Sequence, residues 1–240
     1  ATHATRMLVG YGAFLVTSRT PDFAFRSMGS LFCHTGGRSN DIFSWFIGKV
    51  RHPYAALAKE RASARLPHDE HERAIAALQG QGYYAFEKPL PSDVCERLLH
   101  FAQSQPCVMR PMEDGSPSVP VKTVYPRGAP SAARYDFETQ DLLANNDVQD
   151  IVADLSMVAM AQEYLGARPL LDVVSMWWHT DFLDHPDSNA AQFFHFDMDR
   201  PKWLKVFIFL TDVTATSGPH TFVAGSHRTG GIPQDLLDRG

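Results

Sequence analysis

The sequence predicts a mixed α+β fold, in which a β-rich domain is flanked by helices and preceded by a helical extension. Residues 69–78 and 148–165 have the apolar spacing of amphipathic helices. Residues 173–178 and 203–211 are apolar runs rich in β-branched and aromatic side chains, as in buried strands. Residues 1–65 are broken by glycines and differ in character from the rest of the chain.

Composition restricts the class of protein. A chain of 240 residues with 44% hydrophobic residues has room for one large domain with an extension. The net charge of −5 gives no electrostatic footprint for nucleic acid or for an anionic membrane. No run reaches the roughly 18 apolar residues of a membrane span. Cys33, Cys95 and Cys107 have no metal-binding spacing and fit a reducing compartment, so we expect a cytoplasmic protein that binds neither nucleic acid nor membrane.

The extension, residues 1–65, is expected to be mostly helical. Residues 41–47 and 54–64 look helical, and Pro53 lies between them. The extension has no pattern typical of a binding or catalytic site. Two interpretations of the extension are therefore open. It packs on the domain without a further function, or it acts as a lid or a dimer contact.

The domain is expected to span residues 66–240. It begins with the helix over 69–78, which two glycines end, and continues with a short strand over 83–86 and a helix capped by Ser92. Residues 106–131 are rich in proline, glycine and serine and predict a long loop.

Two later segments complete the predicted elements. The helix over 148–165 should end at Gly166. The run over 203–211 is apolar on both alternating faces, which predicts a strand buried on both sides.

The triplet His195-Phe196-Asp197 precedes this apolar run and is a candidate metal site. On a strand, side chains two residues apart point the same way and lie roughly 6.6 Å apart along the backbone. An imidazole and a carboxylate can then converge on one metal ion at about 2.1 Å. They would form two corners of a face of two histidines and one carboxylate, which leaves positions on Fe(II) for oxygen and a co-substrate.

Two other His-X-Asp triplets compete with it. His185-Pro186-Asp187 contains a proline and lies among turn-forming residues, which favours a loop. His179 and Asp181 end the apolar run at 173–178, and they are the second choice for a ligand pair.

The sequence after His195 adds a more specific signal. A hydrophobic run leads to Thr-Asp-Val at 211–213, then to Gly-Pro at 218–219 and Gly-Ser-His at 225–227. In this order and spacing, about forty residues resemble the phytanoyl-CoA dioxygenase family of Fe(II)/2-oxoglutarate oxygenases. Ala224 departs from the family, which usually has proline there. The resemblance implies a double-stranded β-helix, a jelly-roll or cupin-like barrel, for residues 66–240.

The resemblance also implies specific site residues. His195 and Asp197 would be the iron ligands. Five further residues would lie at the 2-oxoglutarate site: Lys205, Phe207, Trp177, Met176 and Arg134. Each has a plainer alternative, since a lysine among aromatic residues can extend to water, an aromatic run can be core, and Arg134 can lie at the surface.

The family has a second histidine ligand well downstream of the Gly-Ser-His loop, followed by an arginine that pairs with 2-oxoglutarate. The 13 residues after His227 contain no histidine, and His227 corresponds to a loop outside the metal shell. We therefore expect the domain to be truncated at its C-terminal end, with these two residues beyond Gly240.

The implied activity is that of an Fe(II)- and 2-oxoglutarate-dependent dioxygenase. With O2 as oxidant, it would hydroxylate a small organic substrate and release succinate and CO2. Asp197 favours hydroxylation over halogenation, because related halogenases have alanine or glycine at this position. One alternative is a non-catalytic jelly-roll binding protein with an incomplete metal site. Another is a cupin-like enzyme with a different metal, for which His220 and His227 are the further candidate ligands.

Overall fold

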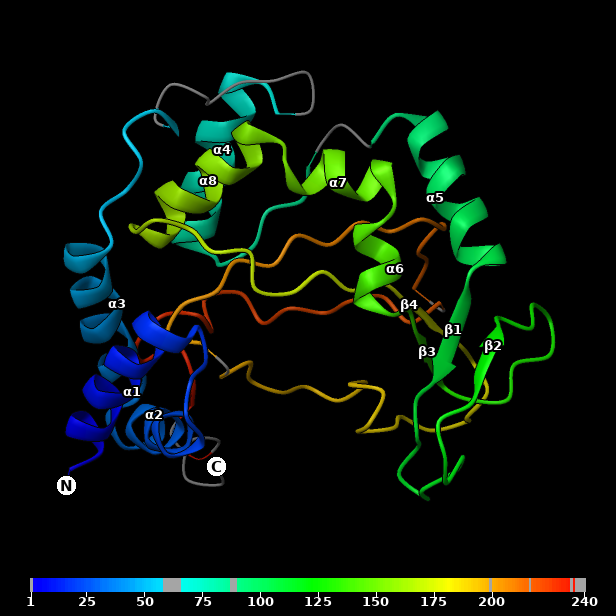
Figure 1. The fold of residues 1–240 in the computed structure, drawn as a ribbon, viewed down its shortest axis with the longest axis horizontal. Helices are drawn as coiled ribbons and strands as arrows, with labels where there is room; N and C mark the ends of the chain where they lie inside the picture. The colour runs from blue at the N-terminus through cyan, green and yellow to red at the C-terminus, as the bar shows by residue number, and fades with distance from the viewer. Residues whose placement is uncertain are drawn as a thin grey trace.

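The described part of the chain has a mixed α+β fold, as the sequence predicts. It contains eight helices and one small antiparallel sheet. Figure 1 shows three N-terminal helices at one end of the molecule, the sheet at the other end, and further helices along one long side. The structure is a computed structural model that describes residues 2–57, 66–86, 90–198, 200–215, 217–233 and 235.

The N-terminal extension forms three helices. They are α1 (His3–Thr17), α2 (Asp22–Thr35) and α3 (Arg38–Val50). The Thr2 hydroxyl caps α1 by accepting from the backbone N–H of Thr5 at 3.4 Å. The predicted helix over 41–47 is confirmed within α3. Of the predicted helix over 54–64, residues 54–57 are not α-helical and 58–64 lie outside the described residues.

The end of α3 contacts the domain at the end of helix α8 (Leu155–Leu165). The Gln162 side chain accepts from the backbone N–H of Tyr54 at 2.7 Å and donates to its carbonyl at 3.0 Å. The Arg168 guanidinium lies 4.4 Å from the centroid of the Tyr54 ring, and its backbone N–H donates to the carbonyl of Arg51 at 3.0 Å. These contacts hold the extension against the domain.

Two helices of the domain form one hydrophobic core. Helix α4 (His68–Gly80) confirms the predicted helix and lies against α8. The buried members of this core are Leu66, Ala74, Ile75, Leu78 and Met160.

The single helix predicted over 148–165 is wrong, because the chain forms α7 (Asn146–Val152) and then α8. The Asp154 carboxylate accepts from the backbone N–H groups of Ser156 at 3.0 Å and Met157 at 3.2 Å. An aspartate in this position competes with helical hydrogen bonding and starts a new helix. Gly166 ends α8 with a positive φ of 67°, as predicted.

The sheet has four antiparallel strands in the order β2-β1-β3-β4. They are β1 (Pro106–Met109), β2 (Lys122–Val124), β3 (Arg134–Asp136) and β4 (Trp177–His179). Strands β1 and β2 lie inside the region predicted as one long loop, so that prediction was wrong over these residues. Proline is tolerated as the first residue of a strand, which is where Pro106 lies.

One face of the sheet packs against helices. Helix α5 (Ser92–Ser104) confirms the predicted helix, but the predicted cap is wrong, because Pro91 takes the cap position and Ser92 makes no side-chain cap bond. The short helix α6 (Thr139–Leu143) joins the same side (Figure 1). The buried members of this core include Val94, Leu98, Cys107, Met109, Tyr135 and Leu142.

Two predicted strands are absent from the structure. Residues 83–86 are irregular, and Tyr84 and Phe86 pack against the α4 and α8 core. Residues 203–211 are also irregular, and residues 205–209 are exposed rather than buried. Leu204 contacts the α4 and α8 core while Leu210 contacts the sheet core, so this run spans the distance between two cores. The two ends of such a run are covered by the two cores, so the run does not need a neighbouring strand to be partly buried.

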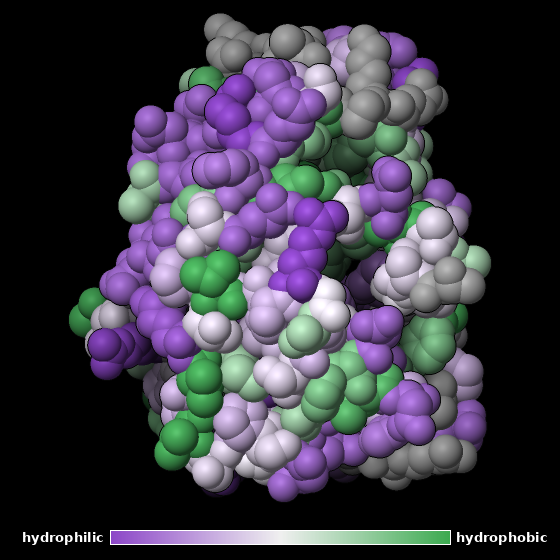
Figure 2. Space-filling view, turned by 90° about the vertical axis from the view of Figure 1, so that its right-hand side faces the viewer, coloured by the Kyte–Doolittle hydropathy of each residue, from purple (hydrophilic) through white to green (hydrophobic). Residues whose placement is uncertain are grey.

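The finer topology stays a prediction, because the described residues form four short strands and no closed jelly-roll is seen among them. On the face at the sheet end of the molecule, hydrophobic residues form separate small patches among hydrophilic ones (Figure 2). Among the residues that the structure describes, no helix has the length and apolar character needed to cross a bilayer.

Candidate metal centre

His195 and Asp197 point toward each other. Nε2 of His195 lies 3.6 Å from Oδ1 of Asp197, and the two side chains are 52% and 40% exposed. They lie in irregular chain rather than on the predicted strand, yet their polar atoms converge. Two donors that each lie about 2.1 Å from one ion in adjacent octahedral positions are about 3 Å apart. A small movement of either side chain would therefore let both bind the same cation.

The hydrogen bond of His195 selects the tautomer that a metal ligand needs. Nδ1 of His195 donates to the carbonyl of Phe193 at 2.8 Å. With the proton on Nδ1, the neutral imidazole has its free lone pair on Nε2, the atom that faces Asp197. Metal-binding histidines commonly donate their other ring nitrogen to a carbonyl in this way.

Lys205 lies on the other side of the carboxylate. Its Nζ donates to Oδ2 of Asp197 at 2.5 Å and lies 4.9 Å from the centroid of the Trp203 ring. This lysine is therefore paired with an acid, and its ammonium group does not simply extend to water. The two oxygens of Asp197 therefore face different partners, His195 and Lys205.

Three of the other predicted residues form a continuous row. The Arg134 guanidinium lies 4.6 Å from the centroid of the Trp177 ring. Trp177 makes an edge contact with Phe207 at 6.4 Å between centroids. Phe207 in turn lies 4.7 Å from the ring of His220. Because Arg134 is on β3 and Trp177 on β4, the sheet places the start of this row, and residues far apart in sequence become neighbours.

Arg134 is largely buried rather than at the surface. Its side chain is 17% exposed, and Nε donates to Oδ1 of Asp136 at 2.6 Å. The ion pair and the stacking on Trp177 hold the guanidinium in one position.

His220 lies beside this row, although its sequence signal is the weakest of those considered. Desolvation lowers its pKa, the charges of Lys205 and His195 lower it further, and Asp197 opposes them. His220 therefore lies within electrostatic reach of the whole cluster, which favours the neutral form of its imidazole. Its place directly after Gly218-Pro219 in the family-like motif was the available clue.

Met176, the residue before β4, faces the opposite side of the sheet from Trp177. Met176 and Trp178 pack against the sheet core, and the Trp178 indole donates to the carbonyl of Ala102 at 3.1 Å. Side chains alternate along a strand, so Trp177 faces away from that core. Met176 and Trp178 therefore belong to the sheet core, whereas Trp177 faces the candidate site.

The competing triplets have structural contacts. Asp187 is buried and accepts from the backbone N–H groups of Glu113 at 2.8 Å and Ala190 at 2.9 Å. His185 is exposed and pairs with Asp184 at 2.7 Å. His179 donates from Nε2 to the carbonyl of Ala190 at 3.0 Å. These bonds favour a structural function for both triplets, within a loop for His185-Pro186-Asp187 and at the end of a strand for His179-Thr180-Asp181.

The Gly-Ser-His loop packs against the end of α4. The Gly225 N–H donates to the carbonyl of Gln81 at 2.8 Å, and Nε2 of His227 donates to that of Gln79 at 3.4 Å. Imidazole donation to the last carbonyls of a helix is a form of helix capping. His227 thus has a structural contact outside the His195 cluster.

Across the described ranges, no group of three His, Cys, Asp or Glu side chains is arranged to hold a metal ion. Comparison of the chain with protein-family models, curated proteins and solved structures gives no match. The resemblance to the phytanoyl-CoA dioxygenase family therefore rests on the motif residues.

Proposed function

We propose that this protein is an Fe(II)- and 2-oxoglutarate-dependent dioxygenase that hydroxylates a small organic substrate. The observation that carries the proposal is the pair of His195 and Asp197, whose Nε2 and Oδ1 atoms converge at 3.6 Å with the histidine in the metal-binding tautomer. The double-stranded β-helix of the resembled family is part of the same proposal.

In this proposal His195 and Asp197 hold the metal, which when bound supplies activation of O2 and of 2-oxoglutarate. The Phe193 carbonyl fixes the imidazole, while Lys205 is the present ion-pair partner of the carboxylate. The two ligand side chains are about half exposed, which leaves space for a co-substrate.

The row of Arg134, Trp177 and Phe207 is proposed to form the wall that receives 2-oxoglutarate. The guanidinium supplies a fixed positive charge for a carboxylate, because its position is held by Asp136 and Trp177. The rings of Trp177 and Phe207 exclude water from the bound keto acid. Succinate and CO2 would be the co-products of hydroxylation.

A second candidate is a non-catalytic binding protein. Two observations favour it: the described residues supply two metal ligands and no third, and the Lys205 ammonium already provides a cation beside Asp197. Two ligands alone hold Fe(II) weakly.

One assay separates the two candidates. The protein is incubated in air with Fe(II), ascorbate and 2-oxoglutarate, and succinate is measured, with metal binding followed separately by calorimetry with Mn(II) under nitrogen. The dioxygenase predicts succinate formation that Asp197→Ala abolishes. Asp184→Ala is the matched control, because Asp184 is also an exposed carboxylate beside a histidine but lies outside the His195 cluster. Mn(II) binding without succinate would support the binding protein.

A further inference from the structure

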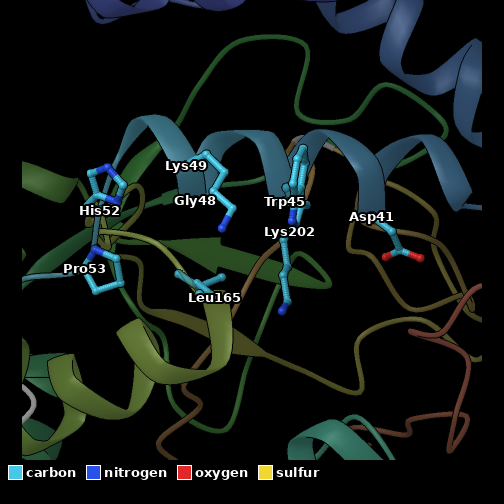
Figure 3. Close-up of a pocket in the computed structure, with 10 residues that line it drawn as sticks. Asp41, Trp45, Gly48, Lys49, His52, Pro53, Leu165 and Lys202 are labelled. Carbon is cyan, nitrogen blue, oxygen red and sulfur yellow. The ribbon is translucent and has the colours of Figure 1, made fainter.

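A second site candidate lies between the extension and the domain. One face of α3, carrying Asp41, Ser44, Trp45, Gly48 and Lys49, borders a hollow of about 480 Å³. Positions 41, 44 or 45, and 48 or 49 are separated by three or four residues, which is the spacing of side chains on one face of a helix. The far wall consists of Leu165 and Gly166 at the end of α8, with Lys202 beside them, and His52 and Pro53 complete the rim (Figure 3).

The hollow offers a flat aromatic surface. Trp45 is 64% exposed on α3, which is a large exposed area for an indole. Leu165 forms part of the opposite wall. A planar apolar body could stack on the indole ring and have its own surface removed from water.

Two ammonium groups provide the charge. Nζ of Lys49 lies 5.7 Å from the centroid of the Trp45 ring. Within the part of the chain that the structure describes, no carboxylate lies within ion-pair distance of Lys49. Lys202 donates to the carbonyl of Tyr164 at 2.5 Å. In Figure 3 the Lys49 side chain points from α3 toward Leu165, and Lys202 lies to the side of Leu165 with its ammonium group turned away from α3.

One carboxylate balances part of this charge. Asp41 lies at the end of the hollow and accepts a hydrogen bond from the hydroxyl of Thr229. Two ammonium groups and one carboxylate leave an excess of one positive charge, apart from His52. A ligand with a single negative charge would neutralise the site.

We propose that this hollow binds a small planar aromatic carboxylate. The ring lies on Trp45 and the carboxylate lies between Lys49 and Lys202. The volume of about 480 Å³ is in the usual range for small-ligand sites. The hollow shares no lining residue with the His195 cluster, so the inference is independent of the proposed oxygenase function.

The test uses 2-naphthoate as the probe and measures binding to the whole protein by calorimetry, with no metal added. The neutral isostere 2-naphthylmethanol is the comparison ligand. We expect 2-naphthoate to bind at least about tenfold more tightly than the alcohol. We also expect its affinity to fall at high salt, because the ammonium groups are partly exposed to solvent.

Two variants locate the site. Lys49→Met and Trp45→Ala should each weaken 2-naphthoate binding by about fivefold or more, whereas Lys122→Met, on β2 and paired with Glu138, should leave it unchanged. Lys49 and Trp45 are both exposed on α3, and thermal melting followed by circular dichroism checks that both variants fold. Equal affinity for the alcohol, or wild-type affinity in Lys49→Met, would overturn the proposal, as would the absence of binding up to about 10 mM probe.

Discussion

Nζ of Lys205 lies 2.5 Å from Oδ2 of Asp197, while Oδ1 of the same carboxylate lies 3.6 Å from Nε2 of His195. The carboxylate thus joins the Lys205 ammonium to the His195 imidazole. In the absence of metal, Lys205 supplies positive charge next to the atoms proposed to hold Fe(II). A divalent cation that enters the site must either share Asp197 with the ammonium or displace it.

Replacing this lysine should therefore strengthen metal binding. A partly exposed ion pair contributes about 1 kcal/mol at most, which corresponds to roughly fivefold in affinity. We predict that Lys205→Met binds Mn(II) up to about fivefold more tightly than the wild type, as measured by anaerobic calorimetry. Asp197→Asn should bind it more weakly than either. If Lys205→Met weakened metal binding, the lysine would support the site rather than compete with the metal.

Close packing between α3 and α8 predicts a second result. A Cβ atom added at Gly48 would lie 2.7 Å from the carbonyl oxygen of Gly166, which is backbone and cannot move aside cheaply. We expect Gly48→Ala to lower the free energy of unfolding by about 1–3 kcal/mol. Gly29→Ala in α2 is the control, because a Cβ there meets no atom within 4 Å.

The control should change stability in the other direction. Alanine is favoured over glycine inside a helix by roughly 0.5–1 kcal/mol, so Gly29→Ala should raise the melting temperature. Thermal melting of the two variants beside the wild type checks both signs. Equal effects would mean that α3 does not lie against Gly166 as described.

Local sequence patterns predicted several of the helices. Apolar spacing located α4 and α5, and Gly166 correctly marked the end of α8. These features depend on residues that are close together in the chain, so a local sequence pattern includes all of the residues that determine them. The break between α7 and α8 was missed because one side chain, Asp154, outweighed an apolar periodicity that continues past it.

Strands were harder to predict because their partners are distant in sequence. The apolar run at 203–211 has strand-like composition, but its burial depends on which segments lie beside it. The converse holds for β1 and β2, which form through cross-strand pairing such as Cys107 with Thr123 in a region whose prolines indicated a loop. The proposed ligand pair was predicted from the motif around His195, whereas the contact between Trp177 and Phe207 can be seen only in the fold.

The pKa of His179 predicts a dependence of stability on pH. Desolvation, and secondly the charge of Arg134, lowers the pKa of His179 below the ordinary value of 6.5, although its bond to Ala190 opposes this. The unfolded chain then binds a proton at higher pH than the folded protein. The stability contribution of His179 is thus complete above about pH 6.5 and is lost as the pH falls toward the folded pKa.

His179→Gln should therefore reduce the loss of stability on acidification below about pH 6.5, since glutamine can still donate to the Ala190 carbonyl. His185 provides a control of opposite sign, because Asp184 raises its pKa. His185→Gln should remove a small contribution that is present at low pH and lost as the pH rises. Urea unfolding at several pH values measures both slopes, and parallel curves for wild type and His179→Gln would contradict the prediction.

The hydrogen bonds of Gln162 predict how firmly the extension is held. This side chain is buried and satisfies both the N–H and the carbonyl of Tyr54, 108 residues away in sequence. Methionine has a similar length but leaves both backbone groups without these partners, at a cost of about 1–3 kcal/mol. We predict that Gln162→Met destabilises the protein by this amount and speeds amide hydrogen exchange at residues 51–54.

Gln149→Met is the matched control for this last experiment. The Gln149 side chain donates to the carbonyl of Leu143 at 2.7 Å, but this bond is exposed and joins residues only six apart. Water can replace it, so the variant should stay within about 0.5 kcal/mol of the wild type with unchanged exchange at residues 51–54. Because the Tyr54 ring also stacks on Arg168, exchange should rise in Gln162→Met without complete release of the segment. Unchanged exchange in Gln162→Met would mean that the end of α3 is held to α8 chiefly by the close contact of Gly48 and by Arg168.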